Sequence, residues 1–341
     1  MNQNELKPGK LLDVYGNLEE AGYAKSLVKK YNRNDIKANK FRIKEWDYYY
    51  IGNNNYGLAL TIADNSYMGL GSVSIIDFKT KKFTTKSVMS FMPNGKTKMP
   101  ASSTEGDVRF NSKKLNFAFE IKNGKRILKG TFDKYDKGID LVFQIELFDE
   151  PSESMVIATP FDKRHHFYYN QKINCMRAKG KVTLGGKIYT FFPEDSFAVL
   201  DWGRGVWTYK NTWYWSSLSS VLDGKKIGFN LGYGFGNNDK ATENMLFYDG
   251  KAYKIEAVTF HIPKIGNQYD YLSPWKITSN DGTVNLTFTP ILNRKDHINA
   301  LIIKSLQDQV FGSFSGKLVI NGKEYEIKDM VGFAERVTNH W

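Results

Sequence analysis

The sequence predicts an all-β protein: two antiparallel β-barrels in tandem, formed by an internal duplication, behind a short N-terminal helical arm. Asn-Gly, Asp-Gly or Gly-Gly pairs recur between short runs of alternating apolar and polar residues, a pattern that favours tight hairpins. The aromatic content of 15% also favours strands. A long stretch of the chain occurs twice. The turn pairs begin at Asn94, Asn123, Gly185, Asp223, Asp249, Asp281 and Asn321.

The N-terminal arm, residues 1–35, is the one part of the sequence with helical spacing. Within residues 17–33, apolar side chains recur three or four positions apart and could form one helix face. These residues are Leu18, Ala21, Leu27, Val28 and Tyr31. We therefore expect a short helix here.

The duplication is clearest in two twelve-residue segments. GKVTLGGKIYTF at 180–191 matches GKLVINGKEYEI at 316–327, and Phe197-Ala198 matches Phe333-Ala334 at the same offset of 136 residues. Upstream, Asp140–Phe143 has a counterpart in Asn285–Phe288, and the aromatic strand beginning at Trp46 has one beginning at Trp213. Because the matches keep their order, we infer two copies of one β-domain.

The two copies set the expected domain limits, 36–205 for the first barrel and 206–341 for the second. Each is a meander of hairpins that closes on itself, which is the lipocalin-like arrangement. A barrel of about eight strands is just wide enough for its own side chains or for one small ligand.

The junction between the copies contains an unusual group of residues. The segment 197–215 holds four of the seven tryptophans together with Asp201 and Arg204. Burial among tryptophans would raise the pKa of Asp201, and a protonated carboxyl group can donate a proton to an alkene or epoxide. Alternatively, Asp201 and Arg204 form an ion pair that holds the junction together. Asp201 and Arg204 are the candidate catalytic residues.

Neighbouring strands supply candidate ligand-binding residues. Glu45 and Asp47 flank Trp46 on the strand face opposite Tyr48 and Tyr50. Asn230 lies among glycines that would leave room for a ligand, although a tight barrel corner explains the glycines equally well. The full set is Trp46, Trp207, Trp213, Trp215, Asn230, Tyr169, His166, Glu45 and Asp47.

We expect neither a metal nor an organic cofactor. The chain has one cysteine, and His165 and His166 would point to opposite strand faces without a third ligand nearby. The sequence has no phosphate loop, and Gly232, Gly234 and Gly236 do not form a dinucleotide-binding turn.

The net charge of +12 comes from scattered lysines, which are typical of protected sheet edges. No basic stripe on a recognisable module indicates nucleic-acid binding, whereas peripheral contact with an anionic membrane needs only diffuse charge. With no secretion signal or long apolar segment, we expect a cytoplasmic protein. The oligomeric state stays open.

Five segments carry a resemblance to known proteins: RIKEWDYYYI (42–51), TIADNSYMGLGSVSIIDF (61–78), EGDVRF (105–110), LDWGRGVW (200–207) and GFAERVTNHW (332–341). Together they resemble an uncharacterised bacterial family of unknown function. That family is more remotely similar to tandem lipocalin-like proteins that include carotenoid hydratase and AttH. Those proteins end their first barrel with an Asp-x-x-Trp-Gly-like stretch, whereas here Trp202 and Gly203 follow Asp201 directly and Arg204 is added.

The predicted function is the binding of a hydrophobic or amphipathic small molecule, lipid-like or isoprenoid-like, near the barrel junction. One hypothesis is a cofactor-independent hydratase, isomerase or cyclase that uses Asp201 as its acid. The other is a lipid-binding or carrier protein without catalysis. An enzyme needs Asp201 free of a neutralising cation, whereas a carrier tolerates an ion pair.

Overall fold

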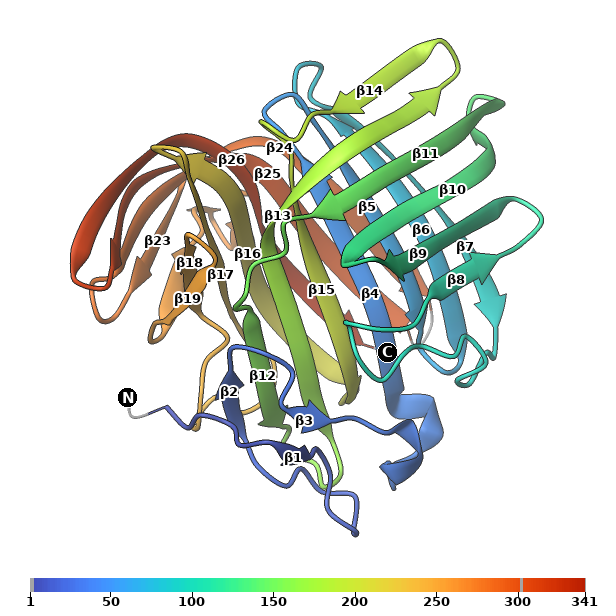
Figure 1. Cartoon of the computed structure of the whole chain (residues 1–341), viewed down its shortest axis with the longest axis vertical. Coiled ribbons are helices and arrows are strands. Elements are labelled where there is room, and N and C mark those ends of the chain that lie inside the picture. The colour runs from blue at the N-terminus through green and yellow to red at the C-terminus, as the bar shows by residue number, and fades with distance from the viewer. Residues whose placement is uncertain (1–2, 301–302, 341) are drawn as a thin grey trace.

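The computed structural model describes residues 3–300 and 303–340 and consists of two curled antiparallel sheets packed against each other (Figure 1). The first sheet has thirteen strands. Its main path is β7 (Lys82–Phe91), β6 (Met68–Asp77), β5 (Tyr56–Asp64), β4 (Ile43–Gly52), β15 (Phe197–Val206), β13 (Phe167–Leu184), β11 (Ile139–Phe148), β10 (Lys125–Asp136), β9 (Leu115–Lys122) and β8 (Val108–Asn111). Off this path, β12 (Met155–Pro160) and β14 (Lys187–Phe191) pair with β13, and β2 (Gly22–Ala24) pairs with β12.

The second sheet has nine strands, and the chain enters it between Val206 and Lys210. Its order is β19 (Lys251–Lys254), β18 (Met245–Tyr248), β17 (Lys225–Tyr233), β16 (Lys210–Leu222), β26 (Lys323–His340), β25 (Ile303–Ile320), β24 (Val284–Ala300), β23 (Trp275–Ser279) and β20 (Val258–His261). The remaining elements are two small sheets, β1 (Gly9–Lys10) with β3 (Lys29–Lys30) and β21 (Lys264–Ile265) with β22 (Gln268–Tyr269), and the 3₁₀ turns η1 (Arg33–Asp35) and η2 (Lys40–Arg42).

The predicted all-β class is confirmed, but the two sheets are half-barrels instead of closed barrels. Among the described residues, the end strands β7 and β8 of the first sheet are not hydrogen-bonded to each other, nor are β19 and β20 of the second. The predicted limits of 36–205 and 206–341 stay predictions, and their terminal residue Trp341 lies outside the described residues. No described helical turn is long and apolar enough to span a bilayer.

The two matching segments lie in equivalent hairpins. Gly180 pairs with Phe191 in the first sheet, and Gly316 pairs with Ile327 in the second, at the same offset. Both glycines have positive φ, 143° and 133°, and both approach a carbonyl of the adjacent strand so closely that a Cβ atom would clash. This shared constraint supports the predicted duplication. The predicted match between Asp140–Phe143 and Asn285–Phe288 is out of register. Leu286 pairs with Gly316, but its structural counterpart, the residue that pairs with Gly180, is Ile145 and not Leu141.

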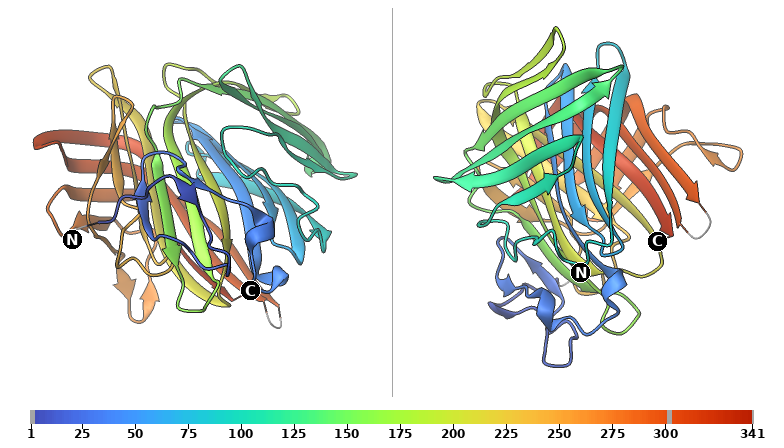
Figure 2. Two further views of the ribbon diagram at one scale, coloured as in Figure 1. Left: turned by 60° about the horizontal axis from the view of Figure 1, so that its bottom comes forward. Right: turned by 90° about the vertical axis from the view of Figure 1, so that its right-hand side faces the viewer.

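The predicted helix at residues 17–33 is wrong. This part of the arm is extended, and Gly22–Ala24 forms β2 at the free edge of β12 (Figure 2). A Cβ atom at Gly22 would lie 2.4 Å from the carbonyl oxygen of Asn4, so the glycine allows two extended segments to approach closely. The apolar side chains Leu18, Leu27 and Val28 pack on the core of the first sheet, so tertiary packing outweighs the helical spacing.

The hydrophobic core has three parts, which place β15 at the centre of the molecule. One cluster fills the concave side of the first sheet, one fills the concave side of the second, and one lies between the sheets. Successive residues of β15 alternate between two of them: Leu200 and Trp202 face the first concave side, and Val199 faces the second sheet. We call the space between the sheets the interlayer.

Candidate functional site

Asp201 lies in the interlayer and forms a buried ion pair with Lys172. The two residues are direct cross-strand neighbours on β15 and β13, and Lys172 Nζ is 2.9 Å from Asp201 Oδ1. Asn170 Nδ2 donates a second hydrogen bond to the same oxygen at 2.6 Å. Lys172 is 1% exposed, and its ammonium lies 4.0 Å from the centre of the Trp215 ring. The charge of Asp201 is therefore compensated inside the protein.

Arg204 is not the partner of Asp201, so the predicted Asp201–Arg204 ion pair is wrong. Residues three apart on a strand point to opposite faces, and Arg204 points into the concave side of the first sheet. There its Nη1 lies 3.0 Å from Asp47 Oδ1, and its guanidinium also donates to the carbonyls of Trp46 and Pro100. Burial raises the pKa of Asp47, while Arg204 opposes this effect.

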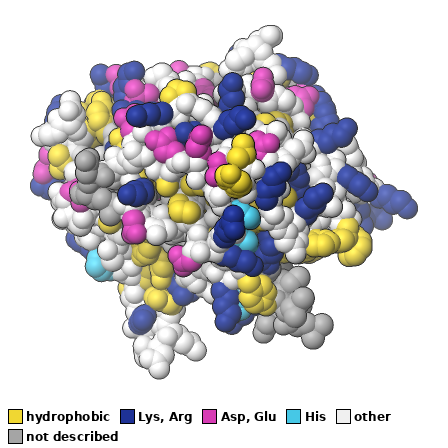
Figure 3. Space-filling model, turned by 90° about the horizontal axis from the view of Figure 1, so that it is seen from below, with side chains coloured by type: hydrophobic (Ala, Val, Ile, Leu, Met, Phe, Trp, Pro, Cys, Tyr) yellow, Lys and Arg dark blue, Asp and Glu magenta, His cyan; other side chains and the backbone are white. Residues whose placement is uncertain are grey.

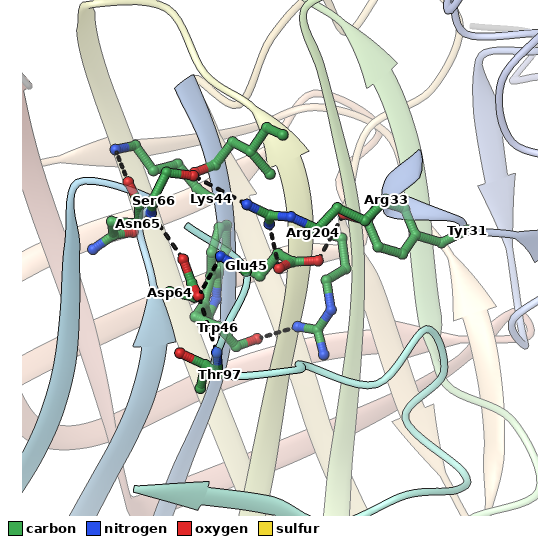
Figure 4. A network of polar contacts seen from close by, with 12 residues as sticks. Tyr31, Arg33, Lys44, Glu45, Trp46, Asp64, Asn65, Ser66, Thr97 and Arg204 are labelled. Carbon is green, nitrogen blue, oxygen red and sulfur yellow. Dashed lines mark hydrogen bonds and ion pairs between the residues drawn. The ribbon is translucent and has the colours of Figure 1, made fainter. Parts of the chain in front are cut away.

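Glu45 and Tyr169 lie on the same concave side as Arg204, in contacts that fasten the N-terminal arm. Glu45 accepts hydrogen bonds from Tyr31 at 2.7 Å and from Arg33, both of which belong to the arm (Figure 4). Tyr169 donates its hydroxyl hydrogen to the carbonyl of Lys29 at 2.9 Å. The sheet thus separates the predicted ligand-binding set: Glu45, Asp47 and Tyr169 lie on one side, and the tryptophans lie on the other.

Three of the four predicted tryptophans, Trp46, Trp207 and Trp213, gather at one end of the interlayer, while Trp215 packs against Tyr48 and Phe333. Trp207 lies 5.7 Å from Trp46 and 5.5 Å from Trp213 between ring centres, and Tyr168 stacks on both Trp46 and Phe235. Trp207 is buried, whereas Trp46 and Trp213 are partly exposed. We call Trp46, Tyr168, Trp207, Trp213 and Phe235 the aromatic cluster. It connects the protein surface to the interlayer.

Gly203 makes room for Trp46 in this cluster, because a Cβ atom at position 203 would lie 2.1 Å from the indole ring. We expect Gly203→Ala to lower the free energy of unfolding by about 1–3 kcal/mol through overpacking. Urea unfolding followed by tryptophan fluorescence measures this effect. The matched control is Gly186→Ala, where nothing lies within 4 Å of the new Cβ atom. An equal change in both variants would contradict the prediction.

His166 lies in the loop before β13. Its Nδ1 is 2.9 Å from the carbonyl oxygen of Arg164, and its buried Nε2 has no hydrogen-bond partner among the described residues. Burial lowers the pKa of His166, and the nearby cations Lys163 and Arg42 add to this effect. The same loop holds Phe161 against Trp207. His166 therefore belongs to the loop that borders the aromatic cluster.

Glu243 reaches the interlayer from the loop between β17 and β18, and no pattern in the sequence predicted it. Its carboxyl group packs on Gly232, where a Cβ atom would be 2.2 Å from Oε1. Within the described part of the chain, neither carboxyl oxygen has a hydrogen-bond partner. Burial raises the pKa of Glu243 to about 7, Lys172 opposes the shift, and Asp201 adds to it. Burial therefore favours the protonated form of Glu243.

Asn230 and Trp215 connect this acid to the ion pair. Trp215 Nε1 donates to Asn230 Oδ1 at 2.7 Å, and Asn230 Nδ2 donates to the carbonyl of Glu243 at 2.9 Å. Both predicted residues are thus in the interlayer. Lys172, Asp201, Glu243, Asn230, Trp215 and the aromatic cluster together form what we call the interlayer site.

Two more polar residues of this layer, Glu335 and Tyr168, were not predicted from the sequence. Glu335 on β26 accepts hydrogen bonds from Trp213 Nε1 at 3.0 Å and from Gln309 Nε2 at 2.9 Å, and burial raises its pKa. The buried hydroxyl of Tyr168 finds no hydrogen-bond partner within residues 3–300 and 303–340. Only Glu335 had a signal in the sequence, since it directly follows the repeated Phe333-Ala334 pair.

The family model of DUF2804, described as a domain of unknown function, matches residues 3–341. The chain belongs to the DUF2804 family. The predicted resemblance to an uncharacterised family is therefore confirmed.

Among solved structures, this DUF2804 chain is similar to an AttH-assigned protein of Nitrosomonas europaea, with a TM-score of 0.56 and 12% identity over 90% of this chain and 96% of that one. It is also similar to kievitone hydratase of Nectria haematococca, with a TM-score of 0.48 and 12% identity over 99% and 97% of the two chains. CghA gives a TM-score of 0.44 and 9% identity over 98% and 97%. No curated protein matches the sequence significantly.

The surface charge of the DUF2804 chain is spread out. On the face seen from below, Lys and Arg lie across most of the surface, more densely on the right, with Asp and Glu among them (Figure 3). Among the described residues, no group of three or more His, Cys, Asp or Glu side chains could hold a metal ion.

Proposed function

We propose that the protein binds a hydrophobic or amphipathic small molecule, lipid-like or isoprenoid-like, at the interlayer site and transfers a proton to it. This chemistry belongs to hydratases, isomerases and cyclases and requires no cofactor. The observation that carries the proposal is Glu243, a buried carboxyl group without a hydrogen-bond partner among the described residues and with a pKa of about 7. A general acid works best when its pKa lies near the working pH.

Glu243 takes the role of acid that the sequence analysis gave to Asp201. Asp201 is bound to Lys172, so we assign it the role of holding that ammonium in place. Lys172 in turn limits the pKa of Glu243. Aromatic faces such as those of Trp207 and Tyr168 can stabilise positive charge that develops on a protonated substrate, because the ring quadrupole attracts cations. The ammonium of Lys172 over Trp215 already uses this attraction.

The route to the acid passes through the aromatic cluster. Its partly exposed members, Trp46 and Trp213, would move aside for a ligand, and the buried Trp207 and Tyr168 would contact it next. We include a cytoplasmic location in this proposal. There, the net charge of +12 would favour contact with anionic membrane surfaces, where a lipid-like substrate is found.

The carrier hypothesis is the second candidate, and the Asp201–Lys172 ion pair favours it. The carboxylate named as the acid in the sequence analysis is neutralised, as a carrier tolerates. In a carrier, the same aromatic cluster would bind the ligand and Glu243 would not transfer its proton. The two functions therefore differ only in what Glu243 does.

The test begins with native mass spectrometry of protein purified from its own host, where we expect a bound small molecule. That molecule is then incubated in D2O with wild type, with Glu243→Gln and with Glu326→Gln, an exposed control on β26. We expect wild type and the control to add one deuterium to carbon, and Glu243→Gln to bind the molecule unchanged. Deuterium addition by Glu243→Gln would contradict the acid, and binding without any addition would favour the carrier.

A further inference from the structure

The concave side of the second sheet ends in a group of tyrosines around Arg336, on the face of the sheet opposite the interlayer. We call Tyr214, Tyr233, Tyr269 and Tyr271 the tyrosine mouth, and all four are partly exposed. Arg336 Nε donates to the hydroxyl of Tyr214 at 3.1 Å, and its guanidinium carbon is 4.7 Å from the centre of the Tyr269 ring. The mouth therefore surrounds a partly exposed cation with aromatic rings.

Arg336 has no carboxylate partner among the described residues, although an acid lies nearby. Asp308 is its cross-strand neighbour on β25. That carboxylate is already engaged, since Oδ2 is 3.0 Å from His297 Nε2 and Oδ1 accepts a hydrogen bond from Asn293 at 2.8 Å. Glu335 precedes Arg336 but points into the interlayer. No described carboxylate therefore forms an ion pair with Arg336.

The guanidinium keeps its charge and has donors to spare. Burial would lower the pKa of Arg336, but hydrogen bonds and attraction from the hydroxyls of Tyr214 and Tyr271 raise it. A guanidinium has five N–H donors, and the three hydroxyls of Tyr214, Tyr269 and Tyr271 cannot occupy them all. The remaining donors match the two oxygens of a carboxylate or phosphate.

A second cation stands at the same mouth. Lys264 and Tyr269 are cross-strand partners in the β21–β22 hairpin, and Lys264 Nζ is 4.8 Å from the centre of the Tyr269 ring. Ile265 at the hairpin end is 75% exposed. Two cations and four aromatic rings favour a ligand that combines negative charge with a flat ring.

We propose that the tyrosine mouth binds a small anion carried on an aromatic or similarly flat ring, a carboxylate or phosphate monoester, with the anionic group on Arg336 and the ring against Tyr269 and Tyr271. This site is independent of the interlayer site, because it lies on the other face of the second sheet. Nothing in it requires Glu243 or Asp201.

The test uses phenyl phosphate, titrated into the full chain by isothermal calorimetry, with inorganic phosphate and phenol as comparison ligands. We expect phenyl phosphate to bind more tightly than either of them. Arg336→Gln should weaken its binding about tenfold or more, since hydrogen bonds to a charged group are lost. Arg109→Gln, an exposed arginine of the first sheet, is the matched control and should leave binding unchanged.

Lys264→Gln on the exposed hairpin gives a second variant in case Arg336→Gln does not fold, and we expect it to weaken binding about threefold to tenfold. Three results would overturn the proposal. They are no saturable binding of phenyl phosphate to wild type, equal affinity for phenyl phosphate and inorganic phosphate, or unchanged affinity in folded Arg336→Gln and in Lys264→Gln.

Discussion

Asp201→Asn is expected to lower the free energy of unfolding by about 3–5 kcal/mol, because it leaves the Lys172 ammonium buried without its carboxylate partner. Burial decides the size of this effect. Lys172 is 1% exposed, and Asn170 cannot replace the lost charge, since its amide is neutral. Urea unfolding at neutral pH measures the change. The matched control is Asp249→Asn, which removes an exposed ion pair with Lys225 and should leave the free energy of unfolding nearly unchanged.

A double variant separates the ion pair from simple loss of packing. Lys172→Met combined with Asp201→Asn removes both charges, and we expect it to recover part of the stability lost by Asp201→Asn alone. The two residues contact each other directly, so their effects should not be additive. A loss below about 1 kcal/mol in Asp201→Asn would show that water or another group compensates Lys172, and would contradict the buried pair.

Glu243→Gln is expected to change how stability depends on pH. Burial raises the pKa of Glu243 from 4.5 to about 7 in the folded protein, so between these values the folded state keeps a proton that the unfolded chain has lost. Its stabilising contribution is therefore complete below pH 4.5 and is lost as the pH rises through 7. Between pH 4.5 and 7, the free energy of unfolding of wild type should therefore fall by up to about 3 kcal/mol relative to that of Glu243→Gln.

The measurement is the difference in unfolding free energy between Glu243→Gln and wild type at pH 5 and at pH 8. Burial also lowers the pKa of Lys254 to about 7, which would make stability rise with pH above 7. The charge of Glu243 raises the pKa of Lys254, so Glu243→Gln should lower that pKa further. This makes the variant gain stability with rising pH relative to wild type, in the same direction as the loss of the Glu243 proton. Glu326→Gln, on the exposed part of β26, should show the same difference from wild type at both pH values. If Glu243→Gln also differed from wild type by the same amount at pH 5 and at pH 8, the raised pKa of Glu243 would be contradicted.

Strand alternation predicted part of the site from the sequence. It placed Glu45 and Asp47 on the face opposite Tyr48 and Tyr50. The structure has this arrangement, because Glu45 and Asp47 contact Tyr31 and Arg204 on the concave side of the first sheet, whereas the two tyrosines belong to the interlayer core. Applied to Asp201 and Arg204, the same rule excludes a shared face, because the two are three residues apart.

The partners of these residues could not be predicted in this way, because they depend on strand register. Lys172 lies opposite Asp201 only through the pairing of β13 with β15. Glu243 comes from a loop of the other sheet, and no hairpin signal or repeat marks it. The helix predicted in the N-terminal arm was wrong for a similar reason, since β2 pairs with β12 more than a hundred residues further along the chain.

The interlayer site is made by both halves of the chain, with Lys172 and Asp201 supplied by the first sheet and Trp215 and Glu243 by the second. Neither half contains the ion pair and the acid together. The two concave sides can therefore change independently during evolution, whereas the two faces that meet must change together. A substitution on one of these faces is tolerated only if the residues that it contacts on the other face still fit. We therefore expect related proteins to show correlated substitutions at positions that contact each other across the interlayer.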